Sequence, residues 1–367
     1  MLELVQPAGL GEELLAWFDR FRRHLPWRDS EDPYELLVAE VMLQQTRSEV
    51  VASRYPEFLD AFPTLEKLAA AEVEEVEAAW SGLGYYRRAR NLHRAARLVA
   101  ERGAFPKSVA EWSELPGVGA YTSAILASRL AGECVPVLDG NVERVLSRFL
   151  ASSRPPKRAG ARRLLLATAA KLLDPGRPGD SNQALMELGS LVCRRGRPDC
   201  AVCPLAPGCQ AFQSDGLDPR AFPAASRGRA REKVHCFTAV VRSGHGLLLH
   251  RRPEDANWLA GRWHLPTVEL ASGDESASEA AELLREEFGG AWDCDVDRVA
   301  VRHAVTYRDF RVRVALARWR PAPGAAAPRA GSDPGRLRWF APEEVAGLPT
   351  SSLLGKSLAR MPIHSGA

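Results

Sequence analysis

The chain has 367 residues, of which 46% are hydrophobic and 26% charged, and its formal net charge is only +3. This length accommodates two domains with separate cores, and the small net charge indicates that any nucleic-acid surface must be local. No uncharged apolar run reaches the roughly 18 residues needed to cross a bilayer, and residues 1–15 lack the features of a signal peptide. We therefore expect a cytoplasmic protein without membrane contact, in which reducing conditions disfavour disulfides.

From residue 10 to about residue 191, apolar residues recur at the three-to-four spacing that is typical of amphipathic helices. Proline and glycine pairs separate the segments, as helix ends require. The segments are 12–24, 34–45, 64–80, 87–102, 120–131, 141–150, 161–173 and 182–192. This part of the chain is therefore predicted to be almost wholly helical.

Glu40 lies in the second of these segments, where residues 36–43 are apolar almost all round. Such a helix should be largely buried, and a lone buried carboxylate is costly unless it is paired or functional. Burial would raise the pKa of Glu40 towards neutrality, which suits a general acid. A structural glutamate that caps the backbone or pairs with an arginine is the alternative on this pattern.

Two glycines flank one small apolar residue in the sequence Leu-Pro-Gly-Val-Gly at 115–119, between two helical segments. Gly117, Val118 and Gly119 could therefore form a tight turn whose N–H groups, at a helix N-terminus, bind a phosphate. Taken alone, the pattern fits an ordinary connection between helices better.

About 20 residues further on, Asp139 in the sequence Leu-Asp-Gly-Asn directly precedes the helical segment 141–150. This is an N-cap position, where a carboxylate is stabilised as an anion. A purely structural cap is an equally good interpretation of this aspartate alone.

Four of the seven cysteines fall in one window and follow the spacing C-x6-C-x2-C-x5-C. Thiolates this close in sequence indicate a zinc ion, an iron–sulfur cluster or a disulfide pair, and the residues alone leave these open. The four are Cys193, Cys200, Cys203 and Cys209, with Arg194, Arg195 and Arg197 between the first two.

Residues 211–233 are rich in proline, glycine and arginine and are predicted to be a linker. The spacing then changes to that of strands, with a hairpin over 235–241 and 246–250 and further strands at 310–319 and 336–340. A helix is expected at 278–288, and 321–334 is a Pro/Ala/Gly-rich excursion. This part of the chain is therefore predicted to be α+β.

The turn at 115–119, the Leu-Asp-Gly-Asn at 138–141 and the cysteine spacing occur together and in this order, over about residues 10–210. This combination resembles the helix–hairpin–helix DNA glycosylase superfamily, whose iron–sulfur members include endonuclease III. The resemblance implies a [4Fe–4S] cluster on the four cysteines, and the uneven spacing is poor for a zinc ribbon. We expect the cluster to shape a basic, phosphate-facing loop, and we expect a monovalent cation at the hairpin.

Further stretches are similar to the adenine glycosylases of the MutY type: 25–28 (Leu-Pro-Trp-Arg), 39–46 (Ala-Glu-Val-Met-Leu-Gln-Gln-Thr), 82–86 (Gly-Leu-Gly-Tyr-Tyr) and 182–187 (Asn-Gln-Ala-Leu-Met-Glu). This resemblance implies that a protonated Glu40 delivers a proton to N7 of adenine while an ionised Asp139 stabilises the sugar cation or adds to it. By the same resemblance, Tyr121 and Asn141 orient these groups, Arg28 and Glu187 hold the adenine, and Gln45 and Tyr85 enter the duplex. Because Tyr121 stands where lyase-active members have lysine, a monofunctional enzyme is expected.

The family's second domain is Nudix-like and reads 8-oxoguanine opposite the adenine, and residues 258–266 resemble a stretch of it. The full R-E-x-x-E-E-x-G box of Mg²⁺-dependent Nudix hydrolases is missing, so recognition is favoured over hydrolysis. Residues 303–307 read His-Ala-Val-Thr-Tyr where the family commonly has His-x-Phe-Ser-His. Thr306 and Tyr307 are therefore the candidates for contact with the oxidised guanine.

We thus expect a helical helix–hairpin–helix glycosylase domain at 1–210 with a cluster loop at 193–209, a linker at 211–233, and an α+β Nudix-like domain at 234–367. The expected partner of this monomer is double-stranded DNA with adenine opposite 8-oxoguanine or guanine. The alternatives are a related iron–sulfur glycosylase with lyase activity for another base, a non-catalytic lesion-binding protein, and a nucleotide-pool hydrolase.

Overall fold

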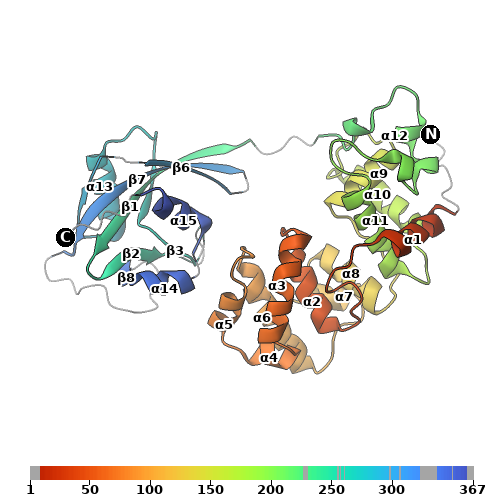
Figure 1. Cartoon of the computed structure of the whole chain (residues 1–367), viewed down its shortest axis with the longest axis horizontal. Helices are drawn as coiled ribbons and strands as arrows, with labels where there is room; N and C mark the ends of the chain where they lie inside the picture. Colours follow the sequence, from red (N-terminus) through yellow and green to blue (C-terminus); the bar gives the residue numbers. More distant parts are fainter. Residues whose placement is uncertain are drawn as a thin grey trace. The chain divides into compact units, whose positions relative to one another are not determined.

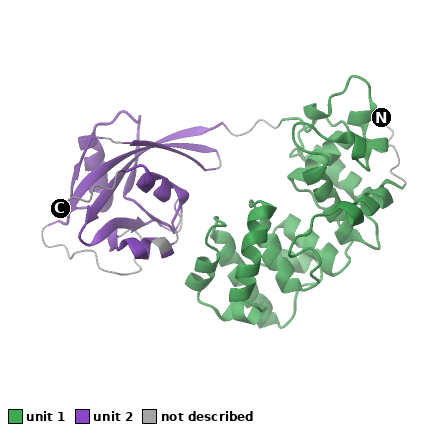
Figure 2. Cartoon of the chain, viewed as in Figure 1, with its two compact units in different colours: residues 1–227 green, residues 228–367 purple. Residues whose placement is uncertain are grey.

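The computed structural model describes residues 9–225, 230–253, 256, 258–259, 261–296, 299–305, 307–322, 337–348 and 350–361. The chain divides into two compact units, residues 1–227 and 228–367, which Figure 2 distinguishes by colour. The boundary lies within the stretch of the sequence that is expected to be a linker. Among the described residues, no helix combines the length and the apolar character that a membrane-spanning segment needs.

The first unit is helical, as predicted, and its helices pack into two hydrophobic cores. Helices α2–α8 surround the first core, whereas α1 and α9–α11 surround the second, and Figure 1 shows the two groups within the unit. The helices are α1 (Leu10–Phe21), α2 (Pro33–Leu43), α3 (Ser48–Ala61), α4 (Leu65–Ala70), α5 (Val73–Ala79), α6 (Arg87–Arg102), α7 (Val109–Ser113), α8 (Ala120–Leu130), α9 (Gly140–Phe149), α10 (Ala159–Leu172), α11 (Pro178–Leu191) and α12 (Gln210–Gln213), with short 3-10 turns at Cys200–Val202, Ala206–Gly208 and Pro219–Ala221.

Helix α2 is buried on almost every side, as its apolar sequence predicts. It begins after the N-cap residue Asp32, whose carboxylate accepts hydrogen bonds from the N–H groups of Tyr34 and Glu35. Because every residue from Leu36 to Met42 is buried, Glu40 is placed inside the unit and not on its surface.

The turn before α8 needs glycine at Gly117, where φ is +81°. A Cβ atom there would lie 2.7 Å from Cβ of Asn91 in α6, so a side chain would also collide with the neighbouring helix. The turn is therefore packed against α6 while α8 continues into the interior of the unit.

The second unit contains an eight-stranded mixed sheet with helices on both faces, which confirms the α+β prediction. The long strands β1 (Glu232–Ser243) and β7 (Arg308–Arg320) run parallel at its centre. Alternate residues of β1 face two different cores: α13 (Ala277–Phe288) packs on one, and α15 (Ser352–Ala359) packs on the other. The other elements are β2 (Gly246–Arg251), β3 (Trp263–His264), β4 (Thr267–Leu270), β5 (Ala291–Cys294), β6 (Val299–Val305), β8 (Leu337–Phe340) and α14 (Pro342–Gly347).

Some predicted elements are wrong in detail. The single helix predicted at 64–80 is two helices, because Glu72 is the N-cap of α5 and its capping box interrupts the chain after α4. Helix α3, which contains Pro56, was not predicted, and neither were the short strands β3–β5 or the longer β6. Most of the Pro/Ala/Gly-rich excursion at 321–334 lies outside the described residues.

Candidate active site

An open cavity with about 1030 Å³ of free space lies between the two groups of helices in the first unit. Side chains from α2, α8, α9 and α11 and from the connection between α1 and α2 line it. Six residues that the sequence analysis proposed for catalysis or substrate binding are brought together here: Arg28, Glu40, Tyr121, Asp139, Asn141 and Glu187. A purine base fits within such a volume.

Glu40 reaches the cavity from the buried helix α2, and only 5% of its surface is exposed. Its Oε2 atom has no hydrogen-bond partner among the described residues. Burial raises the pKa of Glu40 to about 7; the charges of Arg129 and Arg28 oppose this increase, and the charge of Asp139 adds to it. A carboxyl group with this pKa is protonated in a large fraction of molecules near neutral pH and can donate that proton.

Asp139 is the N-cap of α9, as predicted, and its carboxylate is fixed by the first turn of that helix. It accepts hydrogen bonds from the N–H groups of Asn141 (2.9 Å) and Val142 (2.7 Å) and from the side-chain amide of Asn141 (3.1 Å). Burial raises the pKa of Asp139 above its usual value, and these three hydrogen bonds and the charge of Arg144 limit the increase. The donors all favour the ionised form, so the two carboxyl groups have different environments.

Tyr121 and Asn141 lie beside the two carboxyl groups. The hydroxyl group of Tyr121 donates a hydrogen bond to Sδ of Met186 (3.0 Å). Burial, with the charges of Glu40 and Asp139, raises its pKa well above the usual value, so the phenol is neutral. Arg144 in turn fixes Asn141 by donating a hydrogen bond to its Oδ1 atom (2.9 Å).

Arg28 and Glu187 form a buried ion pair at the wall of the cavity, with 2.9 Å between Nη2 and Oε2. Arg28 also donates a hydrogen bond to Oε1 of Gln183 (2.6 Å). Although burial raises the pKa of Glu187, the hydrogen bonds from Arg23 and the charge of Arg28 outweigh it, and the pKa is lowered. Glu187 is therefore a carboxylate with a fixed orientation.

Sequence reasoning did not identify Arg23 or Arg129. Arg23 donates its backbone N–H and its guanidinium to both oxygens of Glu187, at 2.7–3.1 Å. Arg129, in α8, donates to the carbonyl oxygens of Trp27 (3.2 Å) and Arg28 (2.9 Å), which fixes the connection that contains Arg28. Because these contacts join residues more than 100 positions apart, no local sequence pattern could have indicated them.

Gln45 and Tyr85 do not line the cavity. Gln45 follows the end of α2, and Tyr85 lies in the turn before α6; both are exposed, Tyr85 by 52%. Both have left-handed backbone conformations, with φ values of 57° and 48°. Outside glycine such values are uncommon and cluster at functional sites.

The turn that was predicted to bind phosphate offers fewer N–H groups than expected. Val118 is buried and already donates its N–H to the carbonyl oxygen of Leu115 (3.1 Å). Gly119 directly precedes α8, and the described part of the chain provides no partner for its N–H. Val118 is therefore not available as a phosphate donor, whereas Gly119 and the first turn of α8 are. The monovalent cation stays a prediction.

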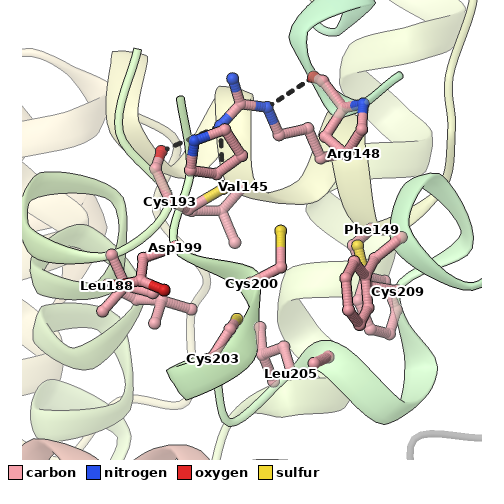
Figure 3. A pocket seen from close by; sticks show the side chains of 15 residues that line it. Val145, Arg148, Phe149, Leu188, Cys193, Asp199, Cys200, Cys203, Leu205 and Cys209 are labelled. Carbon is pink, nitrogen blue, oxygen red and sulfur yellow. Dashed lines mark hydrogen bonds between the residues drawn. The ribbon is translucent and has the colours of Figure 1, made fainter. Parts of the chain in front are cut away.

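The four cysteines of the C-x6-C-x2-C-x5-C pattern line one cavity next to α9 and α11, separate from the cavity of Glu40. Figure 3 shows the sulfur atoms among the apolar side chains of Val145, Leu188 and Leu205. Arg148 donates a hydrogen bond to Sγ of Cys193 (3.3 Å), which favours negative charge on that sulfur.

Among the described residues, no group of three or more Cys, His, Asp or Glu side chains converges as the ligands of one metal ion would. The four thiols nevertheless line one cavity beside the guanidinium of Arg148, and thiols are ligands that would suit a zinc ion or an iron–sulfur cluster. The exposed side chains of Arg194, Arg195 and Arg197 lie on the same loop.

In the second unit, Tyr307 lies in the turn between β6 and β7, and Thr306 falls outside the described residues. The carbonyl oxygen of Tyr307 accepts the N–H of Glu232, and the guanidinium of Arg308 lies 5.8 Å from its ring centroid. Glu279, which has the spacing of a Nudix-box residue, instead forms the capping box of α13 with Ser276. The carboxylate of Glu279 therefore caps the N-terminus of α13.

Two family models match the chain, one in each unit. Residues 38–170 match the HhH-GPD superfamily of base excision DNA repair proteins, and residues 236–360 match the NUDIX domain. The chain is 38% identical over 243 residues to the adenine DNA glycosylase of Mycolicibacterium smegmatis, a match that covers 65% of this chain and 78% of that protein. It is 36% identical over 317 residues to the adenine DNA glycosylase of Arabidopsis thaliana, with 75% of this chain and 50% of that protein covered.

The chain thus spans about half the length of the Arabidopsis relative. The solved structure of a thermostable thymine-DNA glycosylase is also similar, with 26% identity and a TM-score of 0.52 over 56% of this chain and 96% of that one. The helical unit therefore has a fold that is shared by glycosylases acting on different bases.

Proposed function

Because the chain belongs to the adenine DNA glycosylase family, we propose that it hydrolyses the N-glycosidic bond of adenine mispaired with 8-oxoguanine or guanine in double-stranded DNA. The observation that supports this most is the pair of unequal carboxyl groups in one cavity. Burial raises the pKa of Glu40 to about 7, whereas the carboxylate of Asp139 accepts hydrogen bonds that favour its ionised form. One acid and one carboxylate are the requirement for cleaving a glycosidic bond.

The adenine has to leave the stacked duplex before it can reach Glu40, since the cavity lies inside the unit. Arg28, Gln183 and Glu187 then offer a fixed set of donors and acceptors to the edge of the base. Arg23 and Arg129 stabilise that set from behind.

Adenine is a poor leaving group as an anion, so protonation must accompany departure. The protonated Oε2 of Glu40 has no competing hydrogen bond among the described residues and can give its proton to N7. Positive charge then develops on the sugar, and the carboxylate of Asp139 stabilises it or adds to it before water completes hydrolysis. The neutral phenol of Tyr121 lines the same cavity as the two carboxyl groups and donates its hydrogen bond to Sδ of Met186.

Two further expectations of the sequence belong to the same proposal. No lysine lines the part of the cavity that the structure describes, so excision proceeds without a Schiff base. The four cysteines would hold a [4Fe–4S] cluster whose contribution is to shape the Arg194–Arg197 loop, because the thiols line a cavity of their own. In the second unit, the turn at Tyr307 is the proposed contact to the base opposite adenine.

The test is single-turnover release of adenine from duplexes that differ only in the opposite base: 8-oxoguanine, guanine, cytosine or thymine. We expect excision opposite the first two, and loss of at least about 100-fold in Glu40→Gln with duplex affinity nearly unchanged. Glu35→Gln, on the same helix but outside the cavity, is the matched control and should keep the wild-type rate. Unchanged excision by Glu40→Gln contradicts the proposal, and a protein–DNA adduct trapped by borohydride would favour the lyase alternative.

A further inference from the structure

Two neighbouring turns of the first unit are connected through one arginine, Arg88, in the first turn of α6. The turn after α2 contains Gln45, and the turn before α6 contains Tyr85; both are exposed non-glycine residues with left-handed backbones. Six hydrogen bonds of Arg88 reach both turns. Its Nη1 atom donates to the carbonyl oxygens of Val41 (3.1 Å), Met42 (2.7 Å) and Gln44 (2.5 Å), and its Nη2 atom donates to Oγ1 of Thr46 (3.0 Å) and to the carbonyl oxygens of Leu83 (2.9 Å) and Gly84 (3.0 Å).

The bonds of Nη1 replace an ordinary helix ending. The last carbonyl groups of a helix lack partners within it, and glycine usually follows when the chain turns into the left-handed region. Here Gln45 takes that conformation, and the guanidinium of Arg88 satisfies the carbonyl groups at the end of α2. The strained turn therefore depends on a side chain from another helix.

Arg88 does not stabilise the helix in which it lies. A cation at a helix N-terminus is opposed by the helix dipole, and the first turn of α6 has no acidic residue. Arg88 is buried, with only 7% of its surface exposed, yet it has no ion-pair partner among the described residues. Burial lowers its pKa to about 10, so it is still charged at neutral pH. A buried charge without a carboxylate partner, at an unfavourable place in its own helix, indicates a role in the turns that it contacts.

Gln44 extends this connection to the turn before α8. Its side-chain amide donates to the carbonyl oxygen of Gly117 (3.0 Å) and to Oγ1 of Thr122 (3.3 Å). Its own carbonyl oxygen accepts from Arg88. The turn with the available Gly119 N–H, the turn with Gln45 and the turn with Tyr85 are thus joined by two side chains, next to the cavity residues Leu43 and Thr46.

We propose that Arg88, together with Gln44, is a positioning residue that holds Gln45 and Tyr85 as one unit for filling the gap an extruded base leaves in the duplex. This inference rests on the proposed function, because only an enzyme that extrudes its base needs such a unit. An exposed aromatic ring and an exposed amide on stiff turns can stack between neighbouring bases. Since the turns share one guanidinium, displacement of one is transmitted to the other.

The test compares two duplexes in single-turnover excision: adenine opposite guanine, and adenine opposite an abasic-site analogue, where the base has no pairing partner. Arg88→Lys keeps the charge but cannot reach six acceptors. We expect excision of the paired adenine to slow by roughly 10–100-fold and excision of the unpaired adenine by less than about fivefold, because extrusion costs least when the base is unpaired. Gln44→Ala removes the hydrogen bonds to Gly117 and Thr122 but keeps the backbone carbonyl that accepts from Arg88, so it should show the same difference to a smaller degree.

A second readout measures extrusion directly. In the Glu40→Gln background, which keeps the base uncleaved, the fluorescent adenine analogue 2-aminopurine brightens when it leaves the stack. Arg88→Lys should lower this increase at saturating protein while affinity for an undamaged duplex stays within about threefold, since phosphate contacts dominate that affinity. Arg54→Lys is the matched control, because Arg54 donates to the carbonyl oxygen of Ser81 in the same turn, and none of its hydrogen bonds among the described residues reaches α2 or Gln45.

Equal slowing on both duplexes, or a full fluorescence increase in Arg88→Lys, overturns the inference and leaves Arg88 a structural residue. If Arg88→Lys does not fold, Gln44→Ala decides by the same comparison. A wild-type chain that excises adenine from neither duplex contradicts the proposed function, and the fluorescence comparison still decides the role of Arg88.

Discussion

The burial that raises the pKa of Glu40 and makes it an acid also raises the free energy of its ionised form. It lies on a helix whose other residues from Leu36 to Met42 are apolar and buried, and its pKa is raised to about 7. Arg129 and Arg28 limit the increase. The residue therefore changes its charge in the pH range in which the protein works.

The first consequence concerns activity. If Glu40 must be protonated to release adenine, the single-turnover rate should be flat below about pH 6 and fall roughly tenfold per pH unit well above pH 7. A pH–rate profile measured with enzyme in excess over duplex checks this. A rate that stays constant up to about pH 9 would show that another group supplies the proton.

Substitutions of Arg129 test whether its charge lowers the pKa of Glu40. Its charge lowers the pKa of Glu40, so Arg129→Met should move the alkaline fall of the profile to higher pH by up to about one unit. Arg129→Lys retains a charge and should leave the position of the fall nearly unchanged. A fall at the same pH in both variants assigns Arg129 to fixing Trp27 and Arg28 only.

The second consequence concerns stability. The pKa of Glu40 is about 7 in the folded state, and an unfolded glutamate titrates near 4.3. Between these pH values the folded chain binds a proton that the unfolded chain releases, so the free energy of unfolding decreases as the pH rises. This contribution amounts to about 4 kcal/mol across the window and is constant above it. Urea denaturation should therefore show that Glu40→Gln gains stability over wild type between about pH 4.5 and pH 7, and an equal difference at every pH would contradict the linkage.

At the scale of elements, α9 combines a structural and a chemical task in one N-cap residue. Asparagine is as good an N-cap as aspartate, but it cannot carry a negative charge. Asp139→Asn should therefore change the free energy of unfolding by less than about 1 kcal/mol, while adenine release falls by at least about 100-fold. Thermal unfolding and single-turnover excision measured on the same preparation separate the two tasks.

The matched control is Asp32→Asn at the N-cap of α2, which makes the same substitution at a helix start outside the cavity. It should keep both stability and excision. If Asp139→Asn excises adenine at the wild-type rate, the aspartate is only a cap.

The elements that were predicted correctly are those with long, regular patterns or clear end signals. The apolar run of α2, the aspartate before α9 and the run of buried residues in β1 each identify their element locally. The break between α4 and α5 depends on a capping box formed by glutamates, which are also ordinary helix residues. Strands β3 and β5 are too short to show a sequence pattern. Their pairing with β2 and β7 determines their conformation.

Some residues of the candidate site could also be predicted from the sequence, whereas others could not. Glu40 and Asp139 stand out because each is unusual in its own local context, and the structure places both in one cavity. Arg23, Arg129 and Arg88 are ordinary arginines in helical sequence, and only the folded chain shows that they bond Glu187, Trp27 and the end of α2. Supporting residues of this kind act across the fold and leave no periodic trace.

At the scale of the whole molecule, the two units have separate cores, and every residue of the cavity belongs to the first. A chain of residues 1–225 should therefore fold and still excise adenine. If the turn at Tyr307 reads the opposite base, this shortened chain should lose most of its preference for 8-oxoguanine over cytosine. Excision rates on the two duplexes, compared with those of the full chain, measure the change; an unchanged preference would place the recognition of the opposite base in the first unit.

The contact between Tyr121 and Met186 places an oxidisable sulfur atom in the cavity. A thioether is a weak hydrogen-bond acceptor, and oxidation to the sulfoxide adds a polar oxygen in its place. The hydroxyl group of Tyr121 would then be drawn to a stronger acceptor in a new position, next to Glu40 and Asp139. An enzyme proposed to act on DNA containing oxidised guanine thus has, within its own cavity, a sulfur atom through which the same chemical stress can slow repair, and a methionine sulfoxide reductase could restore it.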